Sequence, residues 1–191
     1  MSSTTRAETP SPASASSRPA RDRLWPLWGV LAGVAGFTAT VLLDVRPAAE
    51  MAANDAGGML AVAPEHMSDL DRIGNLIGFL VGFVAVAAMI VFQAAWRARV
   101  ERRFPDSIAA RVVSAGMLVS AAGLALGYGW KGALANYGYD GPEFGMFSDE
   151  GLFVYFMLTD FGPYIPWLGT LVAAAAYGWL AWQERVLSRI L

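Results

Sequence analysis

The sequence predicts an all-α integral membrane protein: a bundle of four transmembrane helices with both termini in the cytoplasm and a short interfacial helix before the last span. Composition supports this class, because 55% of the 191 residues are hydrophobic and only 16% are charged, whereas soluble domains carry about 25% charged residues. The apolar residues also gather in four long stretches that contain few charges. We therefore expect each stretch to supply one span.

The chain starts with a segment that has no apolar face to bury. Residues 1–23 are rich in Ser, Thr, Pro, Ala and Arg, which predicts a disordered cytoplasmic tail. Residues 24–43 follow without a charge and would measure about 30 Å as a helix, the thickness of a bilayer core. This run exceeds the roughly 7 to 15 apolar residues of a cleavable signal peptide, so we expect it to be the first span.

The second and third spans are predicted at residues 73–96 and 110–130, and both are long enough to cross a bilayer with modest tilt. Between them the stretch RARVERRF, residues 97–104, contains four arginines. We expect these arginines to set the topology and to contact anionic lipids. Nucleic acid is not expected as a partner, because no folded cytoplasmic domain would present the arginines.

The last apolar run, residues 152–182, is too long for one crossing, because its 31 residues would measure about 46 Å as a helix. Pro163 and Pro166 predict a break within it. If Gly162 is the N-cap, both prolines fall in the first turn, where backbone donors have no intrahelical partner to lose. The fourth span is therefore predicted at residues 163–183.

Residues 148–159 are predicted to form the short helix before this span. Ser148 is a suitable N-cap, and Asp149 and Glu150 suit the positive end of a helix dipole. The later residues, LFVYFML, are apolar on every side. We expect this helix to lie at the outer interface or against the bundle, because in water it would expose a large apolar patch.

Charge distribution predicts the orientation. A cytoplasmic N-terminus places eleven of the fourteen basic residues inside, including Arg185 and, in the short C-terminal segment 186–191, Arg189, and leaves Arg46, Arg72 and Lys131 outside. Eleven of the sixteen acidic residues would then lie outside. The chain has thirteen arginines but one lysine, and it is rich in alanine. This composition favours a bacterial protein, and hence a bacterial plasma membrane.

Small and polar residues recur on one face of two predicted spans. Lipid tails are as apolar as leucine, so such faces are expected to pack against protein, where backbones approach closely and amides find partners. The face is either a seam within the bundle or a surface for a homo-oligomer or another membrane protein. The residues concerned are Gly74, Asn75, Gly78 and Gly82 in the second span, and Gly116, Ser120, Gly123 and Gly127 in the third.

The sequence contains no catalytic set, and we expect no cofactor and no metal. Haem held between helices needs histidine ligands, and His66, in a predicted loop, is the single histidine. Neither a phosphate-binding Gly-Lys-Ser/Thr loop nor a His-Glu-x-x-His motif occurs. Glu65, His66 and Asp69 together could contribute to a metal site, but a solvated loop followed by a capping box of Ser68 and Asp71 is favoured.

A set of polar side chains is expected at the outer ends of the helices, at one membrane depth. It comprises Asp44, Asp71, Arg72, Lys131, Asp160 and Tyr164. Interfacial anchoring and helix capping account for such a set. The alternative is a shallow, acidic, aromatic-walled site for a cation or a lipid headgroup, with Lys131 paired to Asp160 or Asp71.

These features favour a non-enzymatic interaction, assembly or sensing module whose outer loops meet its partner. The alternative function is an oligomeric transporter or channel subunit that uses Asn75, Lys131 and Asp160 along its path, although the last two lie near the membrane edge. A third hypothesis is an enzyme that acts on a lipid headgroup with Asp71 or Asp160 as its acid. No base or nucleophile accompanies these acids in the sequence. The lipid bilayer is the one partner common to all three.

Overall fold

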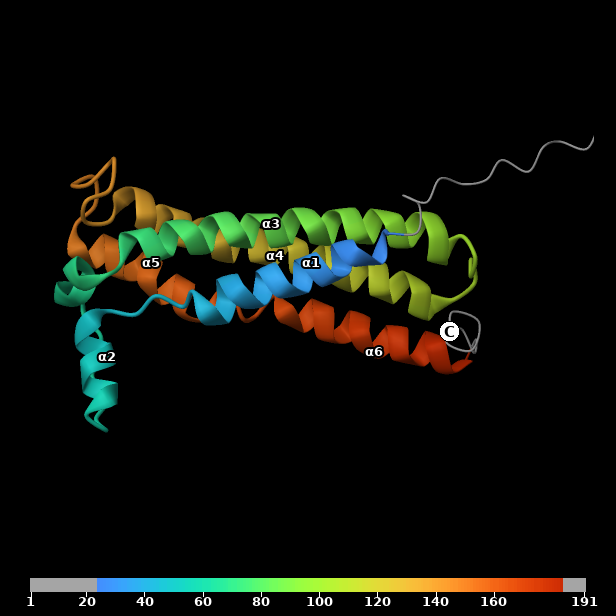
Figure 1. The fold of residues 1–191 in the computed structure, drawn as a ribbon, viewed down its shortest axis with the longest axis horizontal. Helices are drawn as coiled ribbons and strands as arrows, with labels where there is room; N and C mark the ends of the chain where they lie inside the picture. Colours follow the sequence, from blue (N-terminus) through green and yellow to red (C-terminus); the bar gives the residue numbers. More distant parts are fainter. Residues whose placement is uncertain (1–23, 184–191) are drawn as a thin grey trace, which may run out of the picture.

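The computed structural model describes residues 24–183, and all regular structure in this range is helical (Figure 1). The predicted tail, residues 1–23, and the predicted C-terminal segment, residues 186–191, lie outside the described residues. The elements are α1 (Pro26–Phe37), which continues as the π-helix η2 (Thr38–Leu42), α2 (Ala48–Asp55), the 3-10 helix η3 (Pro64–Asp69), α3 (Arg72–Trp96), which continues as the π-helix η4 (Arg97–Glu101), α4 (Ile108–Tyr137), α5 (Asp149–Phe161) and α6 (Trp167–Gln183).

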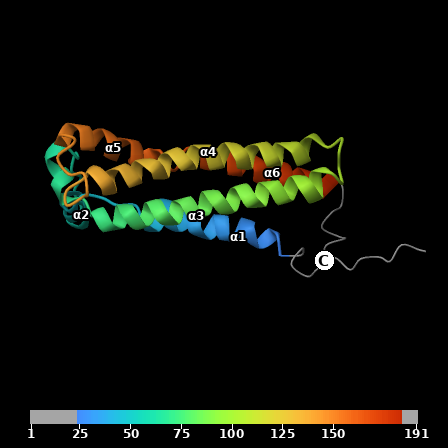
Figure 2. The same cartoon turned by 90° about the horizontal axis from the view of Figure 1, so that it is seen from above.

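Apart from α2 and η3, the helices lie side by side along one long axis (Figures 1 and 2). The antiparallel pair α3 and α4 forms the centre, with α1 packed on α3 and α6 packed on α4. Helices α5 and α6 follow one another along the same side of α4. We call the end with α2, η3 and residues 138–148 the arm end, and the end with residues 97–111 the arginine end.

Two helical segments in the described range are long and apolar enough to cross a membrane, Arg72–Glu101 and Ile108–Tyr137. The shorter segment Pro26–Leu42 is also apolar. Helix α4 continues to Tyr137, seven residues past the end of the predicted third span, residues 110–130. No proline interrupts residues 131–137, and Leu134 and Ala135 are buried. Lys131 therefore lies within α4 and not at its end.

The predicted break before the last helix is present, but the helix begins later than predicted. Residues 162–166 form turns, and α6 starts at Trp167 rather than at residue 163. Pro163 and Pro166 have no N–H, so the carbonyls four residues earlier lose their helical partners. A residue that precedes proline also disfavours the α conformation, and this applies to Ile165. The regular helix consequently starts after the second proline.

The first predicted outer loop, residues 44–72, contains two helices that the sequence analysis missed, α2 and η3. The predicted capping box of Ser68 and Asp71 is wrong. Asp71 caps α3, since its side chain accepts a hydrogen bond of 2.9 Å from the Ile73 N–H, whereas the Ser68 hydroxyl contacts only Glu65 and Asp69. Ser148 holds the predicted N-cap position of α5 without a side-chain hydrogen bond to the first turn of the backbone.

Polar side chains lie inside the bundle and many large apolar ones outside. Among described residues, the buried polar set is Thr40, Asn75, Gln93, Ser114, Ser120, Lys131 and Thr159. Gln93 donates to the Ser114 hydroxyl at 2.9 Å, which joins α3 to α4. Leucine, valine, isoleucine and phenylalanine side chains are exposed along α1, α3, α4 and α6. The apolar exterior is the informative feature, since a water-soluble bundle rarely exposes large apolar patches.

Glycines let the helices approach within backbone contact. A Cβ at Gly82 would overlap the Tyr128 ring, and one at Gly116 would overlap the carbonyl oxygen of Gly169 in α6. At Gly123 and Gly127 it would meet Pro166 and Pro163, respectively. The small-residue faces therefore lie against other helices of the same chain. Gly74 and Gly78 follow this pattern, next to Val45 and Leu43.

Gly116→Ala should destabilise the bundle, because the new methyl group meets backbone rather than a movable side chain. Overpacking of this kind costs about 1–3 kcal/mol, which lowers the Tm by about 5 °C. The matched control is Gly33→Ala in α1, where a Cβ has nothing within 4 Å. Thermal unfolding in detergent, followed by circular dichroism, measures both. Equal Tm values for the two variants would contradict the seam between α4 and α6.

Candidate functional site

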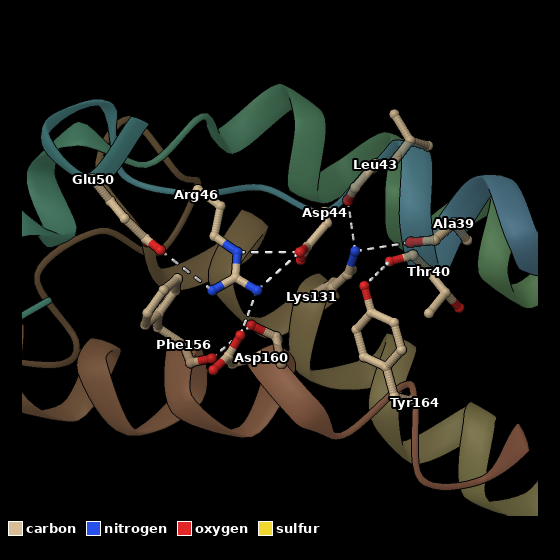
Figure 3. A network of polar contacts seen from close by, with 11 residues as sticks. Ala39, Thr40, Leu43, Asp44, Arg46, Glu50, Lys131, Phe156, Asp160 and Tyr164 are labelled. Carbon is tan, nitrogen blue, oxygen red and sulfur yellow. Dashed lines mark hydrogen bonds and ion pairs between the residues drawn. The ribbon is translucent and has the colours of Figure 1, made fainter. Parts of the chain in front are cut away.

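The two interrupted parts of the bundle face each other across its interior (Figure 3). One is η2, where α1 widens into a π-helix and ends at Leu43. The other is the turn at residues 162–166 between α5 and α6. The Tyr164 hydroxyl donates to the Thr40 carbonyl at 3.2 Å, and the Trp167 indole N–H donates to the Thr40 hydroxyl at 3.2 Å. Polar groups of both breaks thus meet at Thr40.

Lys131 of α4 reaches the end of η2 from the opposite side. Its side chain is 2% exposed, and Nζ donates to the carbonyl oxygens of Ala39 at 2.8 Å and Leu43 at 2.6 Å. The last carbonyls of a helix have no intrahelical partner, and an ammonium group is a favourable donor at that end of the dipole. The expected pairing of Lys131 with Asp160 or Asp71 is therefore wrong: Lys131 binds backbone carbonyls.

Tyr128, one turn before Lys131, completes the contact with η2. Its hydroxyl lies 2.9 Å from the Thr40 hydroxyl and 3.3 Å from the Gly36 carbonyl. One proton assignment satisfies all three groups: Trp167 donates to Thr40, Thr40 to Tyr128, and Tyr128 to Gly36. Gly82 makes room for the tyrosine ring on α3. Each polar atom in this series of hydrogen bonds has a partner, as burial requires.

The turn at residues 162–166 is supported in the same way. Ser120 of α4 donates to the Pro166 carbonyl at 2.6 Å and accepts a hydrogen bond from the Thr170 hydroxyl at 3.0 Å. The neighbouring Gly127 allows the backbone of Pro163 to lie against α4. One face of α4 therefore contacts both interrupted segments.

A group of ion pairs centred on Arg46 lies beside this interior network (Figure 3). The guanidinium contacts Asp44 at 2.9 Å, Asp160 at 2.5 Å and Glu50 at 3.7 Å. These four side chains are partly buried, and Glu50 Oε2 is buried without a hydrogen-bond partner. Burial lowers the pKa of Arg46, but the hydrogen bonds to Asp44 and the charges of Asp44 and Asp160 outweigh it and raise the pKa above its usual value.

Sequence reasoning missed Arg46 as the centre of this group. A signal was present, because Arg46 is one of three basic residues among eleven acidic ones in segments 44–72 and 131–160. The sequence places Lys131 at the end of its helix and therefore predicts Asp160 or Asp71 as its partner. In the structure Lys131 lies further inside α4, so Arg46 is the cation in contact with Asp160.

The other predicted site residues lie outside the ion-pair group. Asp71 caps α3, and Arg72 donates to the Ala135 carbonyl at 2.9 Å. Arg72 also lines a groove of about 460 Å³ between α3 and α4, together with Phe79, Gly129 and Gly132. The structure thus brings together Asp44, Lys131, Asp160 and Tyr164 of the predicted set, and leaves Asp71 and Arg72 apart from them.

The arrangement suits a structural junction better than a reaction centre. Arg46 is ion-paired with the carboxylates around it, and Lys131 donates hydrogen bonds to two backbone carbonyls, so both cations are held by internal contacts. Within residues 24–183 no three His, Asp or Glu side chains are placed to hold a metal ion. His66, considered above with Glu65 and Asp69, instead accepts a hydrogen bond of 3.0 Å from the Ala63 N–H through Nδ1. The junction joins the end of the first helix, α2 and α5.

Comparisons with protein families, with curated proteins and with solved structures found no match for this chain.

The Arg46 group predicts energetic coupling between the first outer segment and α5. Arg46→Gln and Asp160→Asn should be non-additive by about 1 kcal/mol, the upper range for exposed pairs, since these side chains are partly buried. Arg72→Gln, the control at the same end, should be additive with Asp160→Asn to within about 0.5 kcal/mol. Unfolding in mixed detergent micelles measures both cycles. Equal coupling in the two cycles would show that Arg46 has no specific pairing with Asp160.

Proposed function

We propose that this protein is a four-span plasma-membrane protein with both termini in the cytoplasm, and that it acts as a non-enzymatic assembly module whose arm end binds a partner protein outside the cell. Helix α2, which projects from the bundle without a buried residue, carries the proposal.

The distribution of side chains supports the membrane setting. The helix of each of the four proposed spans exposes large apolar residues, such as Val34 in α1, Leu80 in α3, Leu126 in α4 and Leu171 in α6. In water so much exposed apolar surface would drive association, whereas a bilayer solvates it. The first and last tracks, Pro26–Leu42 and Trp167–Gln183, have 17 residues each, about 25 Å of helix. With slight thinning of the bilayer or anchoring by flanking residues, each can cross.

The charges of the two ends support the orientation. The arginine end contains Arg97, Arg99, Arg102, Arg103 and Arg111. The arm end carries most of the acidic residues. Basic residues favour the cytoplasmic side of a span, so the arm end faces outward in this proposal.

The arm end would extend beyond the bilayer core. Helix α4 has 30 residues and measures about 45 Å, compared with about 30 Å for the core. The surplus places the start of α5, η3 and the last turns of α4 at or beyond the outer interface. There Met67, Leu134, Leu152 and Phe156 form a separate apolar cluster. This cluster provides a folded base for α2.

Helix α2 is held in place without being covered. Pro47, immediately before it, is buried, and Glu50 in its first turn contacts Arg46. The rest of the helix and the following turn remain open: Met51 is 51% exposed and Met59 is 91% exposed. Flexible methionines on a surface suit protein contacts, and the exposed Asp55 adds negative charge. We therefore propose a partner that presents an apolar surface with basic residues around it.

One observation favours the alternative, a transporter or channel subunit. Paired helix interruptions are a feature of substrate sites in transporters, and in this chain the buried Lys131 lies beside them. In this chain, however, the polar groups at the breaks bond to one another and to Lys131, Tyr128 and Ser120. A path would require these bonds to open. The assembly function needs no such opening and is therefore preferred.

Cysteine labelling tests the orientation without background, because the chain has no cysteine. Met59→Cys at the arm end should react with a membrane-impermeant maleimide in intact cells. Asp106→Cys at the arginine end should react only after the membrane is permeabilised. Both positions are exposed, so a difference reports the side of the membrane. Labelling of Asp106→Cys in intact cells would overturn the proposed topology.

Photo-crosslinking tests the arm. A benzoylphenylalanine residue at position 51 or 59 should yield one defined protein adduct in cells, and the same residue at position 126, on the exposed side of α4, should not. Asp55→Lys should lower the adduct yield by about threefold or more, since a charge of the wrong sign weakens association. Asp106→Lys at the other end is the matched control.

The same experiment can contradict the proposal. Equal adducts at positions 59 and 126 would show non-specific contact with neighbouring membrane proteins. No adduct at positions 51 and 59, together with ion flux in proteoliposomes that Asp160→Asn abolishes, would favour the transporter alternative instead.

A further inference from the structure

A basic groove lies at the arginine end, between the last turn of α3, η4 and the start of α4. Its volume is about 580 Å³, within the range of about 300–1,000 Å³ typical of small-ligand sites. The residues that matter for binding are Gln93, Arg97, Glu101, Arg102, Pro105 and Arg111. Three arginines and one glutamate give this lining a net charge of +2.

The polar groups of the groove comprise one buried amide and several charged side chains. Gln93 is buried and already bonded to Ser114 of α4, so it forms part of the floor. Arg97 and Arg111 come from the two different helices, and Arg102 comes from the connection between them. Arg97 is paired with Glu101 at 3.6 Å, and Arg111 donates to the Pro105 carbonyl. These contacts use a small part of the five N–H donors that each guanidinium carries.

Several arginine side chains around one groove suit a phosphate. A guanidinium binds phosphate through two parallel N–H bonds, and several arginines around one cavity can divide the oxygens of a phosphodiester among them. The groove also opens at the level where the apolar part of α3 ends, next to Ala94. A ligand whose phosphate meets the arginines would therefore have its apolar part beside exposed helix surface.

We infer that this groove is a binding site for the phosphodiester headgroup of an anionic glycerophospholipid in the cytoplasmic leaflet. Basic pockets between membrane helices on that side are suited to such headgroups. The inference extends the proposed function, because it assigns a ligand to the opposite end of the bundle from the arm. Its leaflet rests on the proposed orientation, but binding itself does not.

Native mass spectrometry of the full chain in detergent, titrated with phosphatidylglycerol or phosphatidylcholine, tests the site. The protein should bind phosphatidylglycerol more tightly. Arg102→Gln should weaken this binding by about 3- to 10-fold, since one charged hydrogen-bonding group is lost. Arg103→Gln is the matched control, because Arg103 is adjacent, has the same charge and does not line the groove. Its affinity should stay within about twofold of the natural protein.

Three results would overturn the inference. Equal affinity for phosphatidylcholine would exclude recognition of the anionic headgroup. An equal loss in Arg102→Gln and Arg103→Gln would indicate general charge attraction rather than a defined groove. Displacement of the lipid by millimolar glycerol phosphate would identify a soluble phosphate ester as the ligand. Circular dichroism confirms that both variants are folded, and Arg102→Lys, which keeps the charge, should recover part of the affinity. Because these measurements use detergent and no partner, they are independent of the labelling and crosslinking results.

Discussion

The requirement that buried backbone groups keep their hydrogen bonds governs the interior of this bundle. In an apolar environment an unpaired carbonyl is costly, and both α1 and the α5–α6 track are interrupted near the same level. The groups freed by these interruptions are met largely by one helix, α4, through Ser120, Tyr128 and Lys131. An unbroken α4 is therefore what allows its neighbours to be broken.

The same face of α4 must also let those neighbours approach. Gly116, Gly123 and Gly127 lie among the three polar side chains, so close backbone contact and hydrogen bonding occur along one stripe. The glycines set the distance between helices, and the hydrogen bonds set their position along the axis. Neither would suffice alone, because apolar packing against α4 gives no preference for one register in a lipid environment.

The sequence predicts well what periodicity and composition determine, and less well what depends on contacts between distant segments. The small-residue faces and the break near Pro163 follow from local rules, and both are present. The pairing of Arg46 with Asp160 could not be derived, because it depends on how far α4 continues past Trp130. A shift of two turns moved Lys131 from the rim to the interior and changed its partner from a carboxylate to carbonyls.

Other features were missed because no local rule marks them. The π-helical turns of η2 and η4 arise where a regular helix gains one residue, which the sequence of residues 38–42 does not signal. Helix α2 does have a signal: Pro47 followed by the good helix formers of AAEMAA. It was overlooked because a polar stretch between two spans was assumed to be a loop. Tertiary contacts at Glu50 then hold this short helix in place.

Magnitudes favour a passive role for the junction at Arg46. Partner binding at α2 would reach the bundle through Glu50 and Arg46 to Asp160, a path of partly exposed ion pairs. Such pairs contribute about 1 kcal/mol or less each, so the coupling between arm and bundle would change an equilibrium by tenfold at most. Shifting a two-state protein from one form to the other needs about 5.5 kcal/mol. An arm coupled this weakly can orient a partner on the bundle, but it cannot drive the network around Lys131 open, which is why assembly rather than signal transmission fits the geometry.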